Sequence, residues 1–291
     1  MYLRARNLKG IVEKNIHAQK GDGGRVLVIG GAERYVGAAV LAGLAALKAG
    51  VDSVIIAAPE TSARLMNAFS PDLITIKLPG EDLAEEHLAE LERLSETAST
   101  VLLGPGLGVS KERESWLAKL LPRIHASLVL DADATKQVKL TGLEESILFA
   151  NQREYQLLKE FNGFTDEHLG TTLGTNILVI KGREDRILTA SGEEAVSGGH
   201  PRATVNGTGD VLAGIAAAFY AQTREALVSA RAACTVAKRA AELLGERRGF
   251  SWLASEMLGA IPEVCAQLRL FRVTKYEPRE PRKRGEAGSG E

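Results

Sequence analysis

The amino-acid sequence predicts a three-layer α/β/α fold, in which helices cover both faces of a mostly parallel central sheet. From Arg25 onward, short apolar runs rich in Val, Ile and Leu alternate with longer segments of helical periodicity. Several of these runs end at or beside glycine, which suits a sharp turn out of a strand. Alternation of this kind indicates βαβ units, whose strands are buried on both faces and are therefore apolar along their whole length.

The first half of the chain alternates strictly between strand and helix. A strand is expected at residues 26–30, because four apolar residues run into Gly30, and an Ala- and Leu-rich helix follows at 36–49 and is stopped by Gly50. Further strands are expected at residues 53–58, 73–76, 100–103, 128–130 and 147–149, with helices at 60–69, 83–96, 111–121 and 153–161.

The pattern changes after Gly174. Three closely spaced strands, at residues 177–180, 186–189 and 193–197, leave no room for helices between them and predict antiparallel pairing at one edge of the sheet. Helices are then expected at residues 211–222, 225–244 and 252–268. Residues 274–291 mix Pro, Gly and both charges without apolar periodicity, so we expect a single domain at residues 1–273 and a mobile charged tail after it.

Charge and composition exclude several classes of protein. The 36 basic and 37 acidic residues nearly cancel, which argues against nucleic acid or an acidic membrane as the main partner. No segment is apolar enough to span a bilayer, and residues 1–20 carry scattered charges instead of a signal-peptide core. Cys234 and Cys265 lie in expected helices, outside any CxxC or Cys/His cluster, so we expect two buried thiols. We therefore expect a cytoplasmic protein.

The strongest chemical signal is the turn Asn206-Gly207-Thr208-Gly209-Asp210, which runs directly into an apolar helix. Two glycines allow a tight turn, and the helix start directs its unpaired N–H groups and its positive dipole end toward that turn. An anion such as phosphate would bind there. A carboxylate beside a phosphate is a poor binding group but a suitable base for an attacking hydroxyl. The alternative is that Asp210 or Thr208 caps the helix.

Further glycine-rich or polar turns follow the expected parallel strands. They are Gly30-Gly31, Gly104-Pro-Gly-Leu-Gly108, Asp131-Ala-Asp133 and Asn151-Gln-Arg-Glu154, and Tyr35-Val-Gly-Ala38 opens the helix after the first strand. The carboxyl ends of parallel strands meet at one edge of a sheet, where open α/β folds bind their ligands. We therefore expect one site built from these turns.

Two common nucleotide motifs are missing. The dinucleotide fingerprint GxGxxG fails after Gly108, and no GxxxxGK[ST] phosphate loop occurs. Lys181-Gly182 ends a strand and could place an ammonium group near a phosphate, although a solvated lysine is an equal alternative. His200 precedes the Gly207–Asp210 turn, and we interpret it as a loop histidine without a catalytic role.

Taken together, these turns resemble those of the ribokinase-like superfamily, and within it the NAD(P)H-hydrate dehydratases. The matching segments occur in family order and span roughly residues 20–260. They are KGDGGRVLVIGG at 20–31, YVGA at 35–38, GPGLG at 104–108, DAD at 131–133, KG at 181–182 and GTGDVLAG at 207–214.

The resemblance implies a repair enzyme on a kinase scaffold. ADP or ATP would phosphorylate the hydroxyl of the hydrated nicotinamide ring, and loss of phosphate would regenerate NADH or NADPH. Asp210 would deprotonate the hydroxyl, and the amides of Gly207, Thr208 and Gly209 would form the anion hole. The residues implied to hold the nucleotide are Lys181, Gly182, Arg183, Glu184, Asp185 and Gly209. The residues implied to contact the hydrated dinucleotide are Ala38, Gly106 and Asp210. Mg²⁺ normally accompanies such a transfer.

One segment departs from the family pattern. Where the family usually carries a His-Pro-Gly-Glu-like segment, this chain has Asn151-Gln152-Arg153-Glu154. Asn151 then takes the place of the histidine that contacts the hydrated cofactor. Asn-x-x-Glu also resembles the magnesium-organising motif of sugar and vitamin kinases, which would make Glu154 a metal ligand. Asn206 also stands where the family more often has glycine.

Three hypotheses follow for the function. The first is NAD(P)H-hydrate dehydratase, the second a small-molecule kinase of the same superfamily, and the third a nucleotide-binding protein without catalysis. The sequence leaves open the choice of ADP or ATP and of NADH-hydrate or NADPH-hydrate. Related folds often assemble, so we expect a homo-oligomer; the Ala-rich helix near residues 227–244 could supply an interface or could equally be buried in the core.

Overall fold

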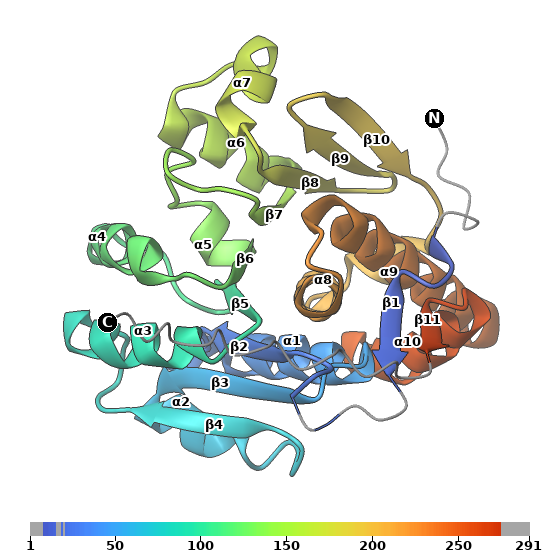
Figure 1. Cartoon of the computed structure of the whole chain (residues 1–291), viewed down its shortest axis with the longest axis horizontal. Helices are drawn as coiled ribbons and strands as arrows, with labels where there is room; N and C mark the ends of the chain where they lie inside the picture. Colours follow the sequence, from blue (N-terminus) through green and yellow to red (C-terminus); the bar gives the residue numbers. More distant parts are fainter. Residues whose placement is uncertain (1–7, 16–18, 20, 275–291) are drawn as a thin grey trace, which may run out of the picture.

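Nine strands form one twisted sheet in the computed structural model, which describes residues 8–15, 19 and 21–274 (Figure 1). Seven strands run parallel. In order across the sheet they are β4 (Ile74–Leu78), β3 (Ser53–Pro59), β2 (Arg25–Ile29), β5 (Thr100–Leu103), β6 (Ser127–Leu130), β7 (Ile147–Asn151) and β8 (Ile177–Lys181). The edge strands β9 (Asp185–Thr189) and β10 (Gly192–Val196) pair antiparallel, which confirms the edge predicted from their close spacing.

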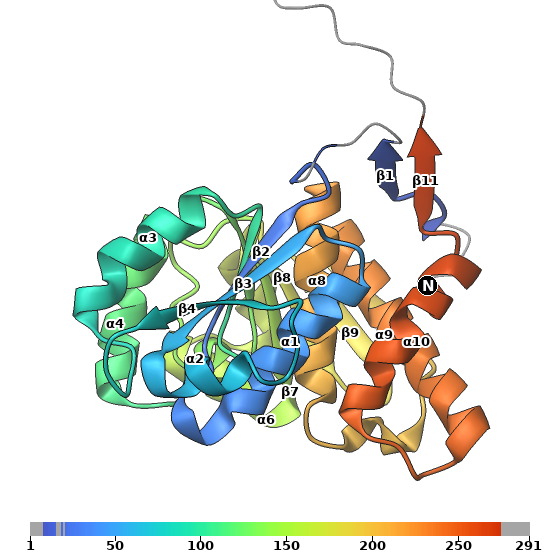
Figure 2. The ribbon, with the colours of Figure 1, turned by 90° about the horizontal axis from the view of Figure 1, so that it is seen from below.

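Helices cover both faces of this sheet, as the alternating pattern predicted (Figure 2). One face carries α1 (Val36–Lys48), α2 (Glu60–Met66), α8 (Thr208–Thr223), α9 (Ala226–Arg248) and α10 (Ala254–Gln267). The other carries α3 (Leu88–Glu96), α4 (Lys111–Leu120), α5 (Ala132–Thr135), α6 (Gln152–Asn162) and α7 (Leu169–Leu173). Short 3₁₀ turns are η2 (Glu33–Tyr35), η3 (Glu85–His87), η4 (Leu121–Arg123), η5 (Asp166–His168) and η6 (Pro201–Thr204).

Each face of the sheet has its own apolar core, because successive residues of a strand point to opposite faces. In β2, Val26 and Val28 belong to the core under α1 and α8, whereas Leu27 and Ile29 belong to the core under α3 and α4. The three-layer fold is therefore confirmed, and both of its faces are fully buried along the central strands.

The ends of the described chain add a small separate sheet that the sequence pattern did not predict. Strand β1 (Val12–Asn15) pairs in parallel with β11 (Phe271–Thr274), so segments more than 250 residues apart lie side by side (Figure 1). Thr274, where we expected the tail to begin, is the last residue of β11. Residues 275–291 of the expected tail lie outside the described residues.

Helix α9, named above as an interface candidate, contributes many of its alanines to the core. Cys234 on α9 and Cys265 on α10 are both free and buried, as expected. In the part of the chain that the structure describes, no helix has the length and apolar character needed to cross a membrane.

Helix α8 is buried over most of its length, and α1 packs directly against it. A Cβ atom added at Gly214 would collide with the carbonyl oxygen of Ala42 on α1. We expect Gly214→Ala to lower the free energy of unfolding by about 1–3 kcal/mol, since the two helices would have to separate. Urea unfolding measures this.

Gly259→Ala is the matched control, because Gly259 lies in helix α10 and an added Cβ there meets open space. It should stabilise the protein by up to about 1 kcal/mol. Equal unfolding midpoints for the two variants would contradict the close packing of α1 on α8.

Candidate active site

The predicted turns meet at one edge of the sheet. Strands β2, β5, β6, β7 and β8 are consecutive neighbours and all run parallel, so the turns at their carboxyl ends must adjoin. The first turn of α8 joins this edge, because a Cβ at Gly209 would lie 3.3 Å from Nζ of Lys181, the last residue of β8.

The turns after β2 and β5 are locked together by backbone hydrogen bonds. The amide of Gly31 donates to the carbonyl of Pro105 over 2.8 Å, and that of Ala32 donates to Gly106 over 2.7 Å. Gly106 has a φ of +65°, and a Cβ there would lie 3.4 Å from that of Ala38. Ala38 and Gly106, the two residues implied to contact the dinucleotide, therefore lie side by side.

The Gly207–Asp210 turn forms the start of α8. Gly207 is the N-cap residue, with a left-handed φ of +97°, and no side chain caps the helix from that position. The Thr208 hydroxyl donates backward to the carbonyls of Ala203 (2.7 Å) and Val205 (3.0 Å). In the structure, therefore, neither Asp210 nor Thr208 caps α8 with its side chain. The amide of Thr208 donates to the carbonyl of Val205 over 3.4 Å, and Val211 is the first residue of α8 whose amide donates to the carbonyl of Gly207, over 3.0 Å. The amides before Val211 therefore lack partners one turn earlier within the helix.

Asp210 lies in the first turn of α8 and is partly buried. Burial raises the pKa of its carboxyl to about 7; the neighbouring Asp131 adds to the rise and Lys181 opposes it. A carboxyl of this pKa is substantially ionised near neutral pH and still basic enough to accept a proton. The environment therefore suits a general base.

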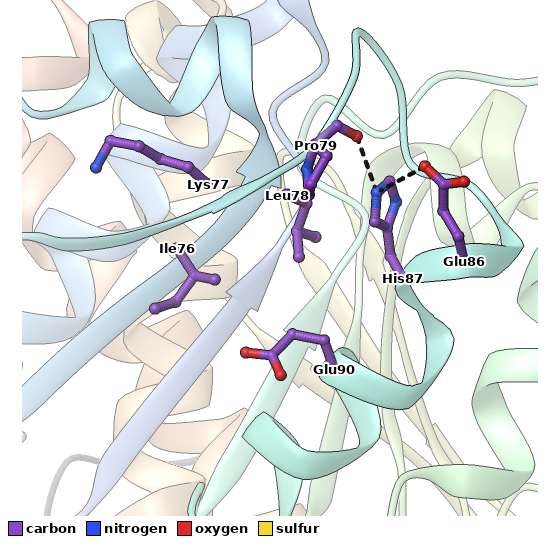
Figure 3. A pocket seen from close by; sticks show the side chains of 7 residues that line it. All are labelled: Ile76, Lys77, Leu78, Pro79, Glu86, His87 and Glu90. Carbon is purple, nitrogen blue, oxygen red and sulfur yellow. Dashed lines mark hydrogen bonds and ion pairs between the residues drawn. The ribbon is translucent and has the colours of Figure 1, made fainter.

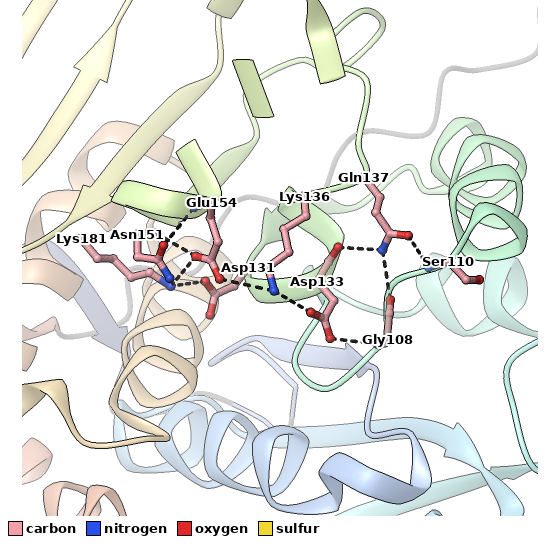
Figure 4. Close-up of polar contacts among 9 residues, drawn as sticks. All are labelled: Gly108, Ser110, Asp131, Asp133, Lys136, Gln137, Asn151, Glu154 and Lys181. Carbon is pink, nitrogen blue, oxygen red and sulfur yellow. Dashed lines mark hydrogen bonds and ion pairs between the residues drawn. The ribbon is translucent and has the colours of Figure 1, made fainter. Parts of the chain in front are cut away.

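Lys181 lies between the carboxylates of Asp131 and Glu154 (Figure 4). Its ammonium lies 2.6 Å from Oδ1 of Asp131 and 3.8 Å from Oε2 of Glu154. Burial lowers the pKa of Lys181, but these carboxylates outweigh burial and raise it, so the ammonium stays charged. Burial also raises the pKa of the Asp131 carboxyl, and the Lys181 ammonium opposes this rise.

The segment that departs from the family pattern forms a capping box at the start of α6. Oδ1 of Asn151 accepts the amides of Arg153 and Glu154, both over 2.9 Å, and Oε2 of Glu154 accepts the amide of Asn151 over 2.8 Å. Because Asn151 uses its oxygen internally, its exposed side chain offers a ligand the amide NH₂ donor.

Glu154 lies between two cations, since Lys136 Nζ is 3.7 Å from its Oε1. Among the described residues, no three His, Cys, Asp or Glu side chains gather closely enough to hold a metal ion. One carboxylate at this position fits a magnesium ion held mainly by nucleotide phosphates rather than a cage made by the protein.

The turn from Lys181 to Asp185 is braced from behind. Asp185 is buried; its Oδ1 accepts the amide of Gly182 over 3.0 Å and pairs with Lys238 of α9 over 3.1 Å. Arg183 and Glu184 are exposed. The fold thus leaves Gly182, Arg183 and Glu184 open to a nucleotide, while Asp185 shapes the turn.

Lys136 and Gln137, which sequence reasoning missed, order the neighbouring loop together with Asp133 of the predicted turn. Oδ2 of Asp133 accepts the amide of Gly108 over 2.9 Å, and Lys136 pairs with Oδ1 of Asp133 over 2.8 Å. Gln137 donates to the carbonyl of Gly108 over 3.0 Å and accepts the amide of Ser110 (Figure 4). The i,i+3 spacing from Asp133 is the signal in the sequence that could have identified Lys136.

Other segments lie outside the site. The amides of Gly21 and Gly23, before the start of β2, donate to Oδ2 of Asp52 over 2.7 and 2.8 Å, at the opposite end of the strands. Lys20 is outside the described residues. His200 is a loop residue, as expected; its Nδ1 accepts the amide of Arg202 and its ring lies 4.8 Å from that of Phe250.

A hollow of about 370 Å³ lies beside the edge strand β4 (Figure 3). It is lined by Ile76, Lys77, Leu78, Pro79, Glu86, His87 and Glu90. Both ring nitrogens of His87 are engaged, Nδ1 by the amide of Ala84 and Nε2 by the carbonyl of Pro79, each over 2.9 Å. None of the predicted site residues lines this hollow.

The model of one protein family, NAD(P)H-hydrate dehydratase, matches residues 26–263. The chain belongs to the NAD(P)H-hydrate dehydratase family. The match includes every residue that the sequence assigned to the site, from Ala38 to Asp210. Membership agrees with the order of the glycine-rich turns and with their meeting at one sheet edge.

Individual members of the family differ in length from this chain. The bifunctional NAD(P)H-hydrate repair enzyme of Pyrobaculum aerophilum is 37% identical over 259 residues, which cover 85% of this chain and 51% of that protein. The chain thus spans about half the length of the first curated relatives it matches. The ADP-dependent (S)-NAD(P)H-hydrate dehydratase of Cenarchaeum symbiosum is 29% identical over 270 residues, covering 88% of this chain and 93% of that one.

Solved structures agree with the ribokinase-like fold. The ADP/ATP-dependent NAD(P)H-hydrate dehydratase of Bacillus subtilis, crystallised with ATP and Mg²⁺, superposes with a TM-score of 0.78 at 20% identity, covering 92% of this chain and 98% of that one. Ribokinase of Arabidopsis thaliana superposes with a TM-score of 0.53 at 11% identity, covering 83% and 98%.

Proposed function

We propose that this chain dehydrates (S)-NAD(P)H-hydrate to NADH or NADPH at the expense of ADP or ATP. The observation that carries the proposal is the partly buried Asp210, whose pKa is raised to about 7, in the first turn of α8 beside Lys181. Family membership supplies the substrate class, and the ADP-dependent relative supplies the nucleotide.

The first step is phosphoryl transfer to the ring hydroxyl. Asp210 accepts the hydroxyl proton, and the hydroxyl oxygen attacks the terminal phosphorus of ADP or ATP. The bond from that phosphorus to its bridging oxygen breaks, and AMP or ADP leaves. The amides of Gly207, Thr208 and Gly209 stabilise the negative charge on the migrating phosphoryl group. The second step breaks the ring C–O bond. Phosphate leaves, the adjacent ring carbon loses a proton, and the ring double bond is restored.

The surrounding turns would bind the two reactants. Lys181, Gly182, Arg183 and Glu184 face the nucleotide, and Asp185 supports their turn. Ala38 and Gly106 form the wall for the hydrated dinucleotide, and Asn151 donates a hydrogen bond to it. Mg²⁺, with Glu154 as its protein ligand, would neutralise phosphate charge when bound. The proposal includes a cytoplasmic homo-oligomer that acts on this small molecule without nucleic-acid or membrane partners.

Product analysis tests the reaction type. The protein is incubated with hydrated NADH, Mg²⁺ and ATP, and phosphorus products are followed by ³¹P NMR. A dehydratase yields inorganic phosphate and NADH in equal amounts. Accumulation of a stable phosphate ester would instead support the kinase hypothesis, and bound but unconsumed ATP would support a binding protein.

The dependence of kcat/KM on pH below neutrality provides a second prediction. Because Asp210 must be ionised to act as base and its pKa is raised to about 7, kcat/KM should increase with pH up to about 7 and then level off. An ordinary aspartate would already be fully active at pH 5. Initial rates at constant ionic strength between pH 5 and 9 distinguish the two profiles.

A further inference from the structure

We propose that Asp131 is a positioning residue, which holds the Lys181 ammonium against the first turn of α8 and away from the Asp210 carboxylate. The inference rests on the proposed function only for the role of Asp210 as base. Nothing in the family match or in the relatives assigns a role to Asp131.

The contact between the two side chains is short and buried. Asp131 is 1% exposed, and its Oδ1 lies 2.6 Å from Nζ of Lys181. Glu154, 8% exposed, contributes a second carboxylate 3.8 Å from the same nitrogen. A Cβ at Gly209 would lie 3.3 Å from Nζ and 4.0 Å from Oδ2 of Asp131. The pair therefore lies directly beneath the first turn of α8.

Two positive groups converge at this point, which is unfavourable without an anion. The N-terminal end of a helix carries about half a positive charge, and the Lys181 ammonium lies against it. The buried carboxylates of Asp131 and Glu154 offset this repulsion before any ligand arrives. The ammonium and the helix start are thus already arranged to receive a phosphoryl group, without a movement of Lys181.

Without Asp131, Lys181 keeps the carboxylate of Glu154 at 3.8 Å and becomes free to turn toward Asp210, the other carboxylate that favours its charged form. The charged groups that face Asp210 are Asp131, Lys181, Asp133 and Glu154, and among them only Lys181 favours its ionised form. A Lys181–Asp210 ion pair would weaken Asp210 as a base and withdraw the ammonium from the phosphoryl group. The Asp131 contact therefore keeps both groups available.

The test follows the Asp210 carboxyl directly by ¹³C NMR titration, with Asp210→Asn to identify its signal. Asp131→Asn should lower the pKa of Asp210 by about one unit or more, because a negative neighbour is lost and a positive one is released. Lys181→Met should raise it, and the double variant should return it close to the parent value. ATP affinity, measured by calorimetry, should fall about 10-fold or more in Asp131→Asn as Lys181 leaves the anion hole.

Asp185→Asn is the matched control, because Asp185 is also a buried aspartate paired with a lysine, Lys238, but faces α9. It should lose stability without moving the Asp210 titration. If Asp131→Asn does not fold, Asp131→Glu keeps the negative charge but moves the carboxylate by one methylene, so ATP affinity in this variant still measures the positioning of Lys181.

An unchanged Asp210 titration and ATP affinity in folded Asp131→Asn would overturn the proposal. An Asp210 titration that moves equally in Asp185→Asn would overturn it as well. Neither readout needs hydrated NADH. Failure of the dehydratase reaction in the parent protein is therefore distinguishable from failure of this inference.

Discussion

Asp210→Asn should reduce kcat of the dehydratase by about 10²–10⁴-fold, the range expected when a general base is removed. Asparagine keeps the size of the side chain but cannot accept the hydroxyl proton. Initial rates with hydrated NADH and saturating ATP measure the loss, and ATP affinity should remain within a few-fold of the parent.

The stability of the same variant provides the control. Because the folded protein raises the pKa of Asp210 above its ordinary value, ionisation of this carboxyl destabilises the fold progressively as the pH rises from about 4 to about 7. Asparagine removes that cost, so Asp210→Asn should unfold at an equal or higher temperature than the parent at pH 8. A folded variant with parental activity would exclude Asp210 as the base.

Gly209→Ala should lower kcat by about 10²-fold, similar to the loss of one anion-hole donor. The residue is inside the first helical turn, where alanine is favourable for the backbone. Its methyl group would lie 3.3 Å from Nζ of Lys181, in the space between that ammonium and the helix start. The phosphoryl group is therefore displaced from the amides while the fold is retained.

Gly259→Ala on α10 again provides the control, since it adds the same methyl group within a helix at a position with no neighbouring atom within 4 Å. Its kcat should equal that of the parent. Equal rates for Gly209→Ala and the parent would show that the start of α8 does not hold the phosphoryl group.

The order of strands and helices could be predicted because the elements have strong local patterns. Strand β2 is apolar on both faces and stops at Gly30, and α8 follows directly from the Gly207–Asp210 turn. The antiparallel edge was predictable from short spacing alone. Strands β1 and β11 could not be predicted in this way. Each is four residues long, and each pairs with a strand at the other end of the described chain.

The site was predicted as a set of turns but not as a set of contacts. Asn151 and Glu154 have the spacing of a capping box, and their hydrogen bonds at the start of α6 are a local cause for that spacing. The resemblance to a magnesium-binding motif did not indicate these hydrogen bonds. Asp185 was grouped with the nucleotide ligands, yet its carboxylate is already engaged behind the turn.

The contacts of Asp131 depend on the sheet order. Lys181 follows Asp131 by 50 residues, and only the intervening strand β7 between β6 and β8 brings the two together. Residue spacing carries no information about such a pair. The charge arrangement that raises the pKa of Asp210 likewise became visible only in the fold.

Recovery of the near-ultraviolet absorbance of reduced nicotinamide is the direct measurement of the proposed dehydration. The purified protein is mixed with hydrated NADH and Mg²⁺, with ADP, with ATP or with no nucleotide, and Asp210→Asn is run in parallel. We expect recovery that requires a nucleotide and is abolished in Asp210→Asn. Absence of recovery by folded protein that still binds ATP would contradict the proposed dehydration and would direct attention to the kinase hypothesis.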